Sequence, residues 1–220
     1  MTVDAASGTA PSGTAKRKRA PLFIALAALA VLGAIALDTK VVVIGSESDA
    51  RQQAFDPDGF GQTQFPRIRD LVVERAPEAP ALASELAADD KAAIEKYATM
   101  AGTFAVFPVR LTGVVGEGKS GVFDVAVEGL PEGTRVRVQT GPAINGTELR
   151  DVPGDIEFGA FKNQIEYQDA GSGINRAMAA ETLGDLDRDA LPGRTISVVG
   201  VFKLINPKNW LVTPVQLEVR

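Results

Sequence analysis

The spacing of hydrophobic residues changes near Gly102 and divides the chain into two regions. Before this point, apolar residues recur every three or four positions: Phe65, Ile68 and Val72 follow this spacing, and residues 81–100 contain a second such stretch. After it, apolar and polar residues alternate, as in strands with one buried face. The pattern therefore predicts helices over residues 38–102, followed by a β-domain over residues 103–220.

The β-domain contains five predicted strands, over residues 104–115, 121–127, 134–140, 195–204 and 210–219. A segment with helical spacing, residues 158–183, lies between the third and fourth strands, and we expect the Gly-Ser-Gly triplet at 171–173 to break it. Five strands with a helix inserted at that place is the order of an OB-type barrel. We predict an α+β chain ending in an OB-like barrel, with a Greek-key β-sandwich as the alternative.

Residues 38–102 are expected to form a helical connector. Asp56 followed by Pro57 is typical of a helix start, because Asp can cap the helix and Pro fits its first turn. Pro66 is expected to interrupt this helix or to start a turn, since proline removes a backbone hydrogen bond. The connector would hold the barrel close to the membrane.

Residues 21–37 form an uncharged apolar run that follows a basic block at residues 16–19. Nine strongly apolar side chains in this run each favour membrane insertion by about 0.3–0.6 kcal/mol. We predict a transmembrane anchor or signal-anchor here, with residues 1–20 as a disordered basic tail in the cytoplasm and the later domain outside. A cleaved signal peptide is the alternative, because Ala34 and Ala36 form a small-x-small pair.

Composition narrows the possible chemistry. The sequence has no cysteine and no histidine, which excludes disulfides, thiolate or imidazole metal sites and catalysis that depends on these residues. We therefore expect no cofactor and no metal. Acidic residues outnumber basic ones, 28 to 23, and four of the basic residues lie in the block at 16–19. This balance argues against nucleic acid or anionic lipid as partners.

Two segments of the β-domain carry candidate ligand-binding residues. Gly141 and Gly146 would let backbone groups approach a ligand, and carboxylate, amide, guanidinium and aromatic groups together are suited to a small polar ligand such as a sugar. Turn formation, helix capping and surface solvation are the alternative roles. The seven candidates are Glu148, Arg150, Asp151, Asn163, Gln164, Tyr167 and Asn175.

Carboxylates are the remaining candidates for catalysis. Asp151, Asp155 and Glu157 could supply the pair that a glycoside hydrolase needs, but their spacing does not define a separation across a cleft. Trp210, the single tryptophan, is expected to be a core residue rather than a platform for a sugar.

Three segments in this order resemble a family of bacterial predicted periplasmic lipoproteins of unknown function (DUF2291). They are residues 141–151 (GPAINGTELRD), residues 158–167 (FGAFKNQIEY), and the closing strand pair with LPGR at 191–194 and TPV at 213–215. The resemblance runs from about residue 37 to residue 220. Family members are often encoded beside sugar ABC-importer components, which implies an accessory role at the inner membrane. Where relatives have a lipid-modified cysteine, residues 36–40 are ALDTK, so we expect the helix to anchor this chain.

Together these features predict a non-enzymatic, membrane-anchored accessory or binding protein. Its expected location is the bacterial inner membrane, with a single span and the C-terminal domain in the periplasm. Expected partners are an ABC-importer subunit, its substrate-binding protein or a small polar ligand such as a sugar. A carboxylate-dependent glycoside hydrolase and a structural envelope protein are the alternatives.

Overall fold

The computed structural model describes residue 24, residues 28–34 and residues 55–220. Contacts group the chain into two compact units, Met1–Ala54 and Phe55–Arg220. Residues 28–34 are helical. Among the described residues, no helix is both long enough and apolar enough to cross a membrane. The predicted tail at residues 1–20 lies outside the described residues, as does most of the predicted anchor at 21–37.

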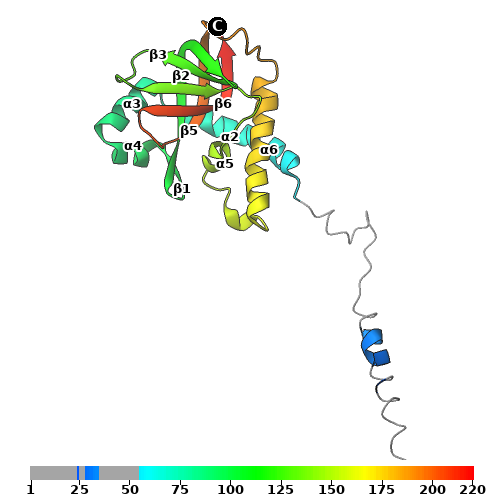
Figure 1. Ribbon diagram of the computed structural model, residues 1–220. Helices are drawn as coiled ribbons and strands as arrows, with labels where there is room; N and C mark the ends of the chain where they lie inside the picture. Colours follow the sequence, from blue (N-terminus) through cyan, green and yellow to red (C-terminus); the bar gives the residue numbers. More distant parts are fainter. Residues whose placement is uncertain (1–23, 25–27, 35–54) are drawn as a thin grey trace, which may run out of the picture. The chain divides into compact units, whose positions relative to one another are not determined.

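Six strands form one sheet, and five of them close into a barrel (Figure 1). The sheet order is β1-β2-β3-β4-β6-β5, and β2 also pairs with β5, which closes the barrel. Neighbouring strands are antiparallel except β4 and β6, which are parallel. The strands are β1 (Thr99–Ala101), β2 (Phe104–Lys119), β3 (Val122–Val127), β4 (Arg135–Gln139), β5 (Thr195–Lys203) and β6 (Asn209–Val219).

Strands β2 to β6 are the five strands predicted from the alternation, and their closure gives an OB-type barrel rather than the sandwich. Strand β1 was not predicted, because three residues are too few to show a period of two. It extends the sheet by pairing with the start of β2.

Helices flank the barrel, with α6 on one side and α3 and α4 on the other (Figure 1). Along the chain, α6 comes between β4 and β5, which is where the helical insertion was predicted. The helices of the predicted connector belong to the same compact unit as the barrel. The helices are α2 (Pro57–Arg75), α3 (Ala79–Ala88), α4 (Asp90–Tyr97), α5 (Glu148–Asp151) and α6 (Gln164–Leu183), with a 3-10 turn at Phe158–Ala160.

Helix α2 begins at the predicted position, but it is not interrupted at Pro66. The Asp56 side chain accepts hydrogen bonds from the backbone N–H groups of Asp58 and Gly59, both at 3.1 Å. The helix continues through Pro66, which corrects the prediction of an interruption. Phe65 and Ile68, on either side of this proline, are completely buried. Their burial stabilises the helix against the loss of one backbone hydrogen bond.

Strand β5 separates two hydrophobic cores. Ile196, Val198 and Phe202 face the first core, which fills the barrel and extends beneath α3 and α4. Val199 and Val201 alternate with them and face the second core, formed with α2, α5 and α6. The apolar face of α2 is therefore buried against the outside of the barrel, so the helices are part of the domain's stability.

Helices α2 and α6 cross closely because two glycines meet there. A Cβ on Gly61 would overlap the backbone of Gly173, and a Cβ on Gly173 would overlap the carbonyl of Pro57. Helix α6 continues through the triplet at 171–173, which corrects the expectation that this triplet would break it. Glycine weakens an isolated helix, so the presence of Gly61 and Gly173 is explained by the close contact between the two helices.

We expect Gly173→Ala to lower the free energy of unfolding by about 1–3 kcal/mol, although alanine is the better helix former. The added methyl group must push Pro57, and hence the start of α2, away from α6. Urea denaturation would measure the loss. Gly159→Ala is the control, because no atom lies within 4 Å of its added Cβ. Equal stability of the two variants would contradict the close crossing.

Candidate functional site

Helix α5 brings several of the candidate residues together. It occupies four residues, Glu148–Asp151, and it packs against α6 and β5. Its side chains meet Tyr167 of α6 and Lys203 of β5. We use the name α5 cluster for Thr147, Glu148, Arg150, Asp151, Tyr167 and Lys203.

Arg150 and Asp151 form a buried ion pair at the centre of the α5 cluster, with side chains that are each 6% exposed. Arg150 Nε donates to Asp151 Oδ1 at 2.9 Å, and Nη1 donates to the carbonyl of Tyr167 at 3.0 Å. The guanidinium also lies 3.6 Å from the centre of the Tyr167 ring. Asp151 Oδ2 accepts from Thr147 Oγ1 at 2.7 Å. These groups satisfy one another, so a ligand could reach them only by displacing internal contacts.

Glu148 and Lys203 form the more open edge of the α5 cluster. Lys203 Nζ lies 3.9 Å from Glu148 Oε1 and 3.5 Å from Thr147 Oγ1. Burial raises the pKa of the Glu148 carboxyl, although the Lys203 charge acts in the opposite direction. Glu148 therefore keeps its proton to a higher pH than an exposed glutamate. Lys203 could not be predicted as part of this cluster, because it lies far along the chain and approaches Glu148 only in the folded barrel.

The other three candidates have separate positions. Asn163 caps α6 and accepts hydrogen bonds from the backbone N–H groups of Ile165 and Glu166, both at 2.9 Å. Gln164 is exposed at the first position of α6. Asn175, in the middle of α6, donates to the carbonyl of Gly146 at 3.0 Å. Asn163 thus has the capping role that was the alternative to ligand binding, whereas Asn175 is buried and joins α6 to the loop at Gly146.

The three carboxylates considered for hydrolysis lie in different environments. Asp151 is buried in the α5 cluster. Asp155 pairs at the surface with Arg67 of α2 at 2.7 Å, and this hydrogen-bonded partner lowers the pKa of its carboxyl. Glu157 is exposed. Within the described residues, no group of three or more acidic side chains could hold a metal ion.

The outer face of β3, β4 and β6 carries a second polar group of side chains. Arg135 donates to both carboxylate oxygens of Asp124, at 2.6 and 2.7 Å. Arg137 donates to Asn209 Oδ1 at 3.2 Å, and its Nε is buried without a hydrogen-bond partner. OB folds commonly bind ligands on the corresponding face. The alternation of residues 134–140 predicted that these arginines face outward but did not indicate a site.

A groove of about 620 Å³ lies between α2 and α6. Ala177 and Ala180 contribute apolar surface to its lining, and the buried side chain of Phe65 lies beneath them. Two ion pairs link the helices beside it: Asp58 with Arg176 at 2.6 Å, and Arg69 with Glu181. Gln62 also lines the groove. The sequence could not predict this feature, since it depends on how the two helices cross.

Comparisons with known proteins agree with the fold and indicate a family. The model of a family described as predicted periplasmic lipoprotein (DUF2291) matches residues 25–218. The crystal structure of an OB-fold protein from Thermotoga maritima is similar with a TM-score of 0.60 and 19% sequence identity, covering 76% of this chain and 99% of that chain. No curated protein matches the sequence. At this identity, the structural similarity supports the OB fold alone.

Proposed function

The chain belongs to the predicted periplasmic lipoprotein family, DUF2291, and from this premise we propose that it is a non-catalytic binding protein acting at the periplasmic face of the inner membrane. Membership of the family supports a periplasmic location. The partner class that we propose is a protein, such as an ABC-importer subunit or its substrate-binding protein. An importer is proposed because members of the family that the chain resembles are often encoded beside sugar ABC-importer components.

The main support is that the buried polar residues of the α5 cluster bind one another. A catalytic or sugar-binding site needs polar groups directed at an open space. Arg150 and Asp151 instead direct their polar atoms at each other, at Thr147 and at the backbone of α6. The groove between α2 and α6 offers open apolar surface beside charged pairs, which suits a segment of a protein partner.

Anchoring would make a weak interaction effective. The sequence has no cysteine to which a lipid could be attached, and residues 21–37 supply an apolar run in its place. We therefore propose that this run holds the protein in the membrane with a single span. Confinement near a membrane-bound partner raises the effective concentration and hence the occupancy of the complex.

Site-specific crosslinking tests the proposed surface. A photoreactive amino acid placed at Gln62, in the groove, should capture a specific membrane or periplasmic protein when the full-length chain is expressed in cells. The same amino acid at Glu132, an exposed residue before β4, is the matched control. An importer component captured from Gln62 alone would support the proposal. The same products from both positions, or none from Gln62, would contradict it.

The hydrolase alternative makes a different prediction. We expect the purified full-length protein to release no product from a panel of glycosides, because Asp151 is buried in an ion pair, whereas Asp155 and Glu157 lie at the surface. Turnover that is lost in Asp151→Asn, with the fold retained by circular dichroism, would replace the binding proposal with the hydrolase.

A further inference from the structure

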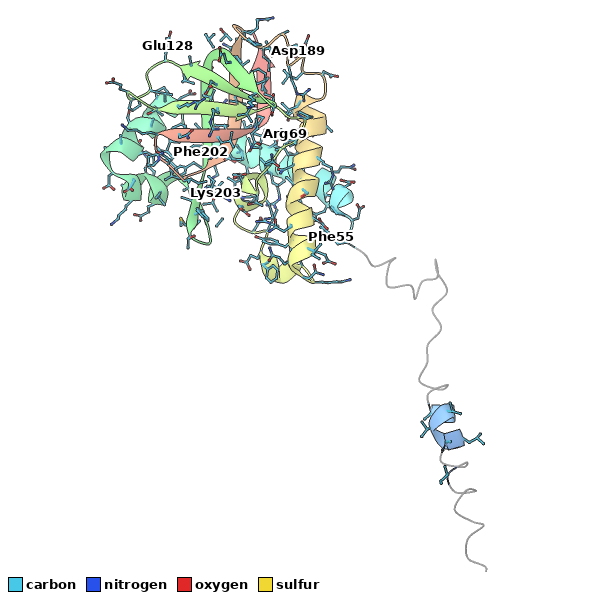
Figure 2. The ribbon with its side chains drawn as sticks, in the orientation of Figure 1. Phe55, Arg69, Glu128, Asp189, Phe202 and Lys203 are labelled. Carbon is cyan, nitrogen blue, oxygen red and sulfur yellow. The ribbon has the colours of Figure 1, made fainter. Side chains whose placement is uncertain are left out.

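Five aromatic side chains meet where α2 and α6 begin. Phe55, Phe60 and Phe161 contact one another, with ring centres 5.4–5.7 Å apart. Tyr167 contacts Phe161 at 5.4 Å and Phe158 at 5.6 Å, which continues the series. We call these five residues the aromatic patch. Figure 2 shows Phe55 at the start of α2, beside the lower part of α6.

The aromatic patch is partly open to solvent. Phe158 is 50% exposed, and the other four rings are half-buried. Ile165, in the first turn of α6 beside the patch, is 72% exposed. By contrast, Phe107, Phe202 and Trp210 in the barrel core are fully buried. Single exposed apolar residues are common, but a connected series of large rings at the surface indicates a contact surface.

The position of the patch along the chain identifies its occupant. Phe55 is the first residue of the domain and also a member of the aromatic patch. Residues 38–54 join it to the proposed anchor; a chain of that length extends to no more than about 60 Å, and about 25 Å is typical of a flexible one. The bilayer surface is therefore within reach of the patch.

The chemistry of the patch also fits a membrane surface. Aromatic side chains are enriched at the boundary between lipid headgroups and acyl chains, and their insertion does not need an opposite charge. This matters because the chain is acidic overall and would not be attracted to anionic lipid. We propose that the aromatic patch inserts into the headgroup region of the membrane that holds the anchor. The inference rests on the proposed membrane anchoring.

Insertion would give the domain a defined orientation. A single tether to an anchor would leave the domain free to rotate. A second contact through the aromatic patch would fix the starts of α2 and α6 at the membrane surface. The groove between these helices would then be held at a constant height and direction relative to a membrane-bound partner.

The absence of cysteine makes a direct test possible. Ile165→Cys and, as the matched control, Ile205→Cys can each be labelled with an environment-sensitive fluorophore in the full-length protein. Ile205 is 78% exposed and belongs to the turn between β5 and β6. The labelled proteins are reconstituted into neutral phosphatidylcholine vesicles that contain a headgroup-level nitroxide quencher.

We expect several-fold stronger quenching at position 165 than at position 205, unaffected by added salt and reduced by Phe158→Ser in the Ile165→Cys protein. Equal quenching at the two positions would overturn membrane insertion and leave a protein as the occupant of the patch. Vesicle flotation, which measures whether the protein is bound to the vesicles at all, distinguishes a patch that does not insert from an anchor that does not hold. A protein that floats without quenching at 165 refutes insertion, whereas a protein that does not float refutes the anchoring itself.

Discussion

Replacing Arg150 with alanine is expected to lower the free energy of unfolding by about 3–5 kcal/mol. The change leaves the Asp151 carboxylate in a buried site without its cation, and it removes the hydrogen bond to the Tyr167 carbonyl. The substitution also removes the guanidinium that lies against the Tyr167 ring. Urea denaturation followed by the fluorescence of Trp210 would measure the effect.

A double substitution separates a structural role from a binding role. Arg150→Met with Asp151→Leu replaces both charges by apolar side chains of similar size, so it should be much closer to the wild type in stability than Arg150→Ala. If the α5 cluster has only a structural role, the double variant should also form the same crosslink from Gln62 as the wild type. If Arg150→Ala is as stable as the wild type, the internal pairing does not hold the two side chains. Arg150 and Asp151 would then again be candidates for ligand binding.

Trp210→Ala is expected to destabilise the domain by about 3–5 kcal/mol through the barrel core. Trp210 is completely buried, as predicted from its place in the sequence, and its ring stacks on Phe202 at 4.5 Å between centres. Phe202 in turn stacks on Phe107 at 5.5 Å. Truncation would leave a large cavity at the end of this stack. Thermal unfolding followed by circular dichroism would measure the loss.

Trp210→Phe is the matched control for the cavity. It keeps an aromatic ring against Phe202 but removes the hydrogen bond from the indole N–H to the Pro207 carbonyl, which spans 2.8 Å. Trp210→Phe should therefore lower the free energy of unfolding clearly less than Trp210→Ala does. Equal losses would show that the stacked core is not what stabilises the barrel.

The barrel could be predicted from the sequence because its signals are local. The alternation of Arg135 and Arg137 with Val136 and Val138 is visible without knowledge of any partner strand, and β4 has this pattern. The order of five strands with one helical insertion was then sufficient to favour the OB fold. The N-cap at Asp56 is also local, because the side chain binds the next backbone groups.

Other features depend on residues that are distant in sequence. Pro66 and the triplet at 171–173 suggested breaks, but packing between α2 and α6 keeps both helices continuous. The contact of Glu148 with Lys203 exists because β5 passes beside α5. The groove and the aromatic patch arise in the same way, from side chains of two helices. Local patterns cannot specify such contacts.

Fusing reporters to Arg220 of the full-length chain tests most directly whether the domain lies outside the cytoplasm and is held by residues 21–37. Alkaline phosphatase, which is active only after export, should be active and remain in the membrane fraction after alkaline extraction. A β-galactosidase fusion, which is active only in the cytoplasm, should be inactive. An active β-galactosidase fusion, or phosphatase activity released in soluble form, would contradict a membrane-anchored periplasmic binding protein.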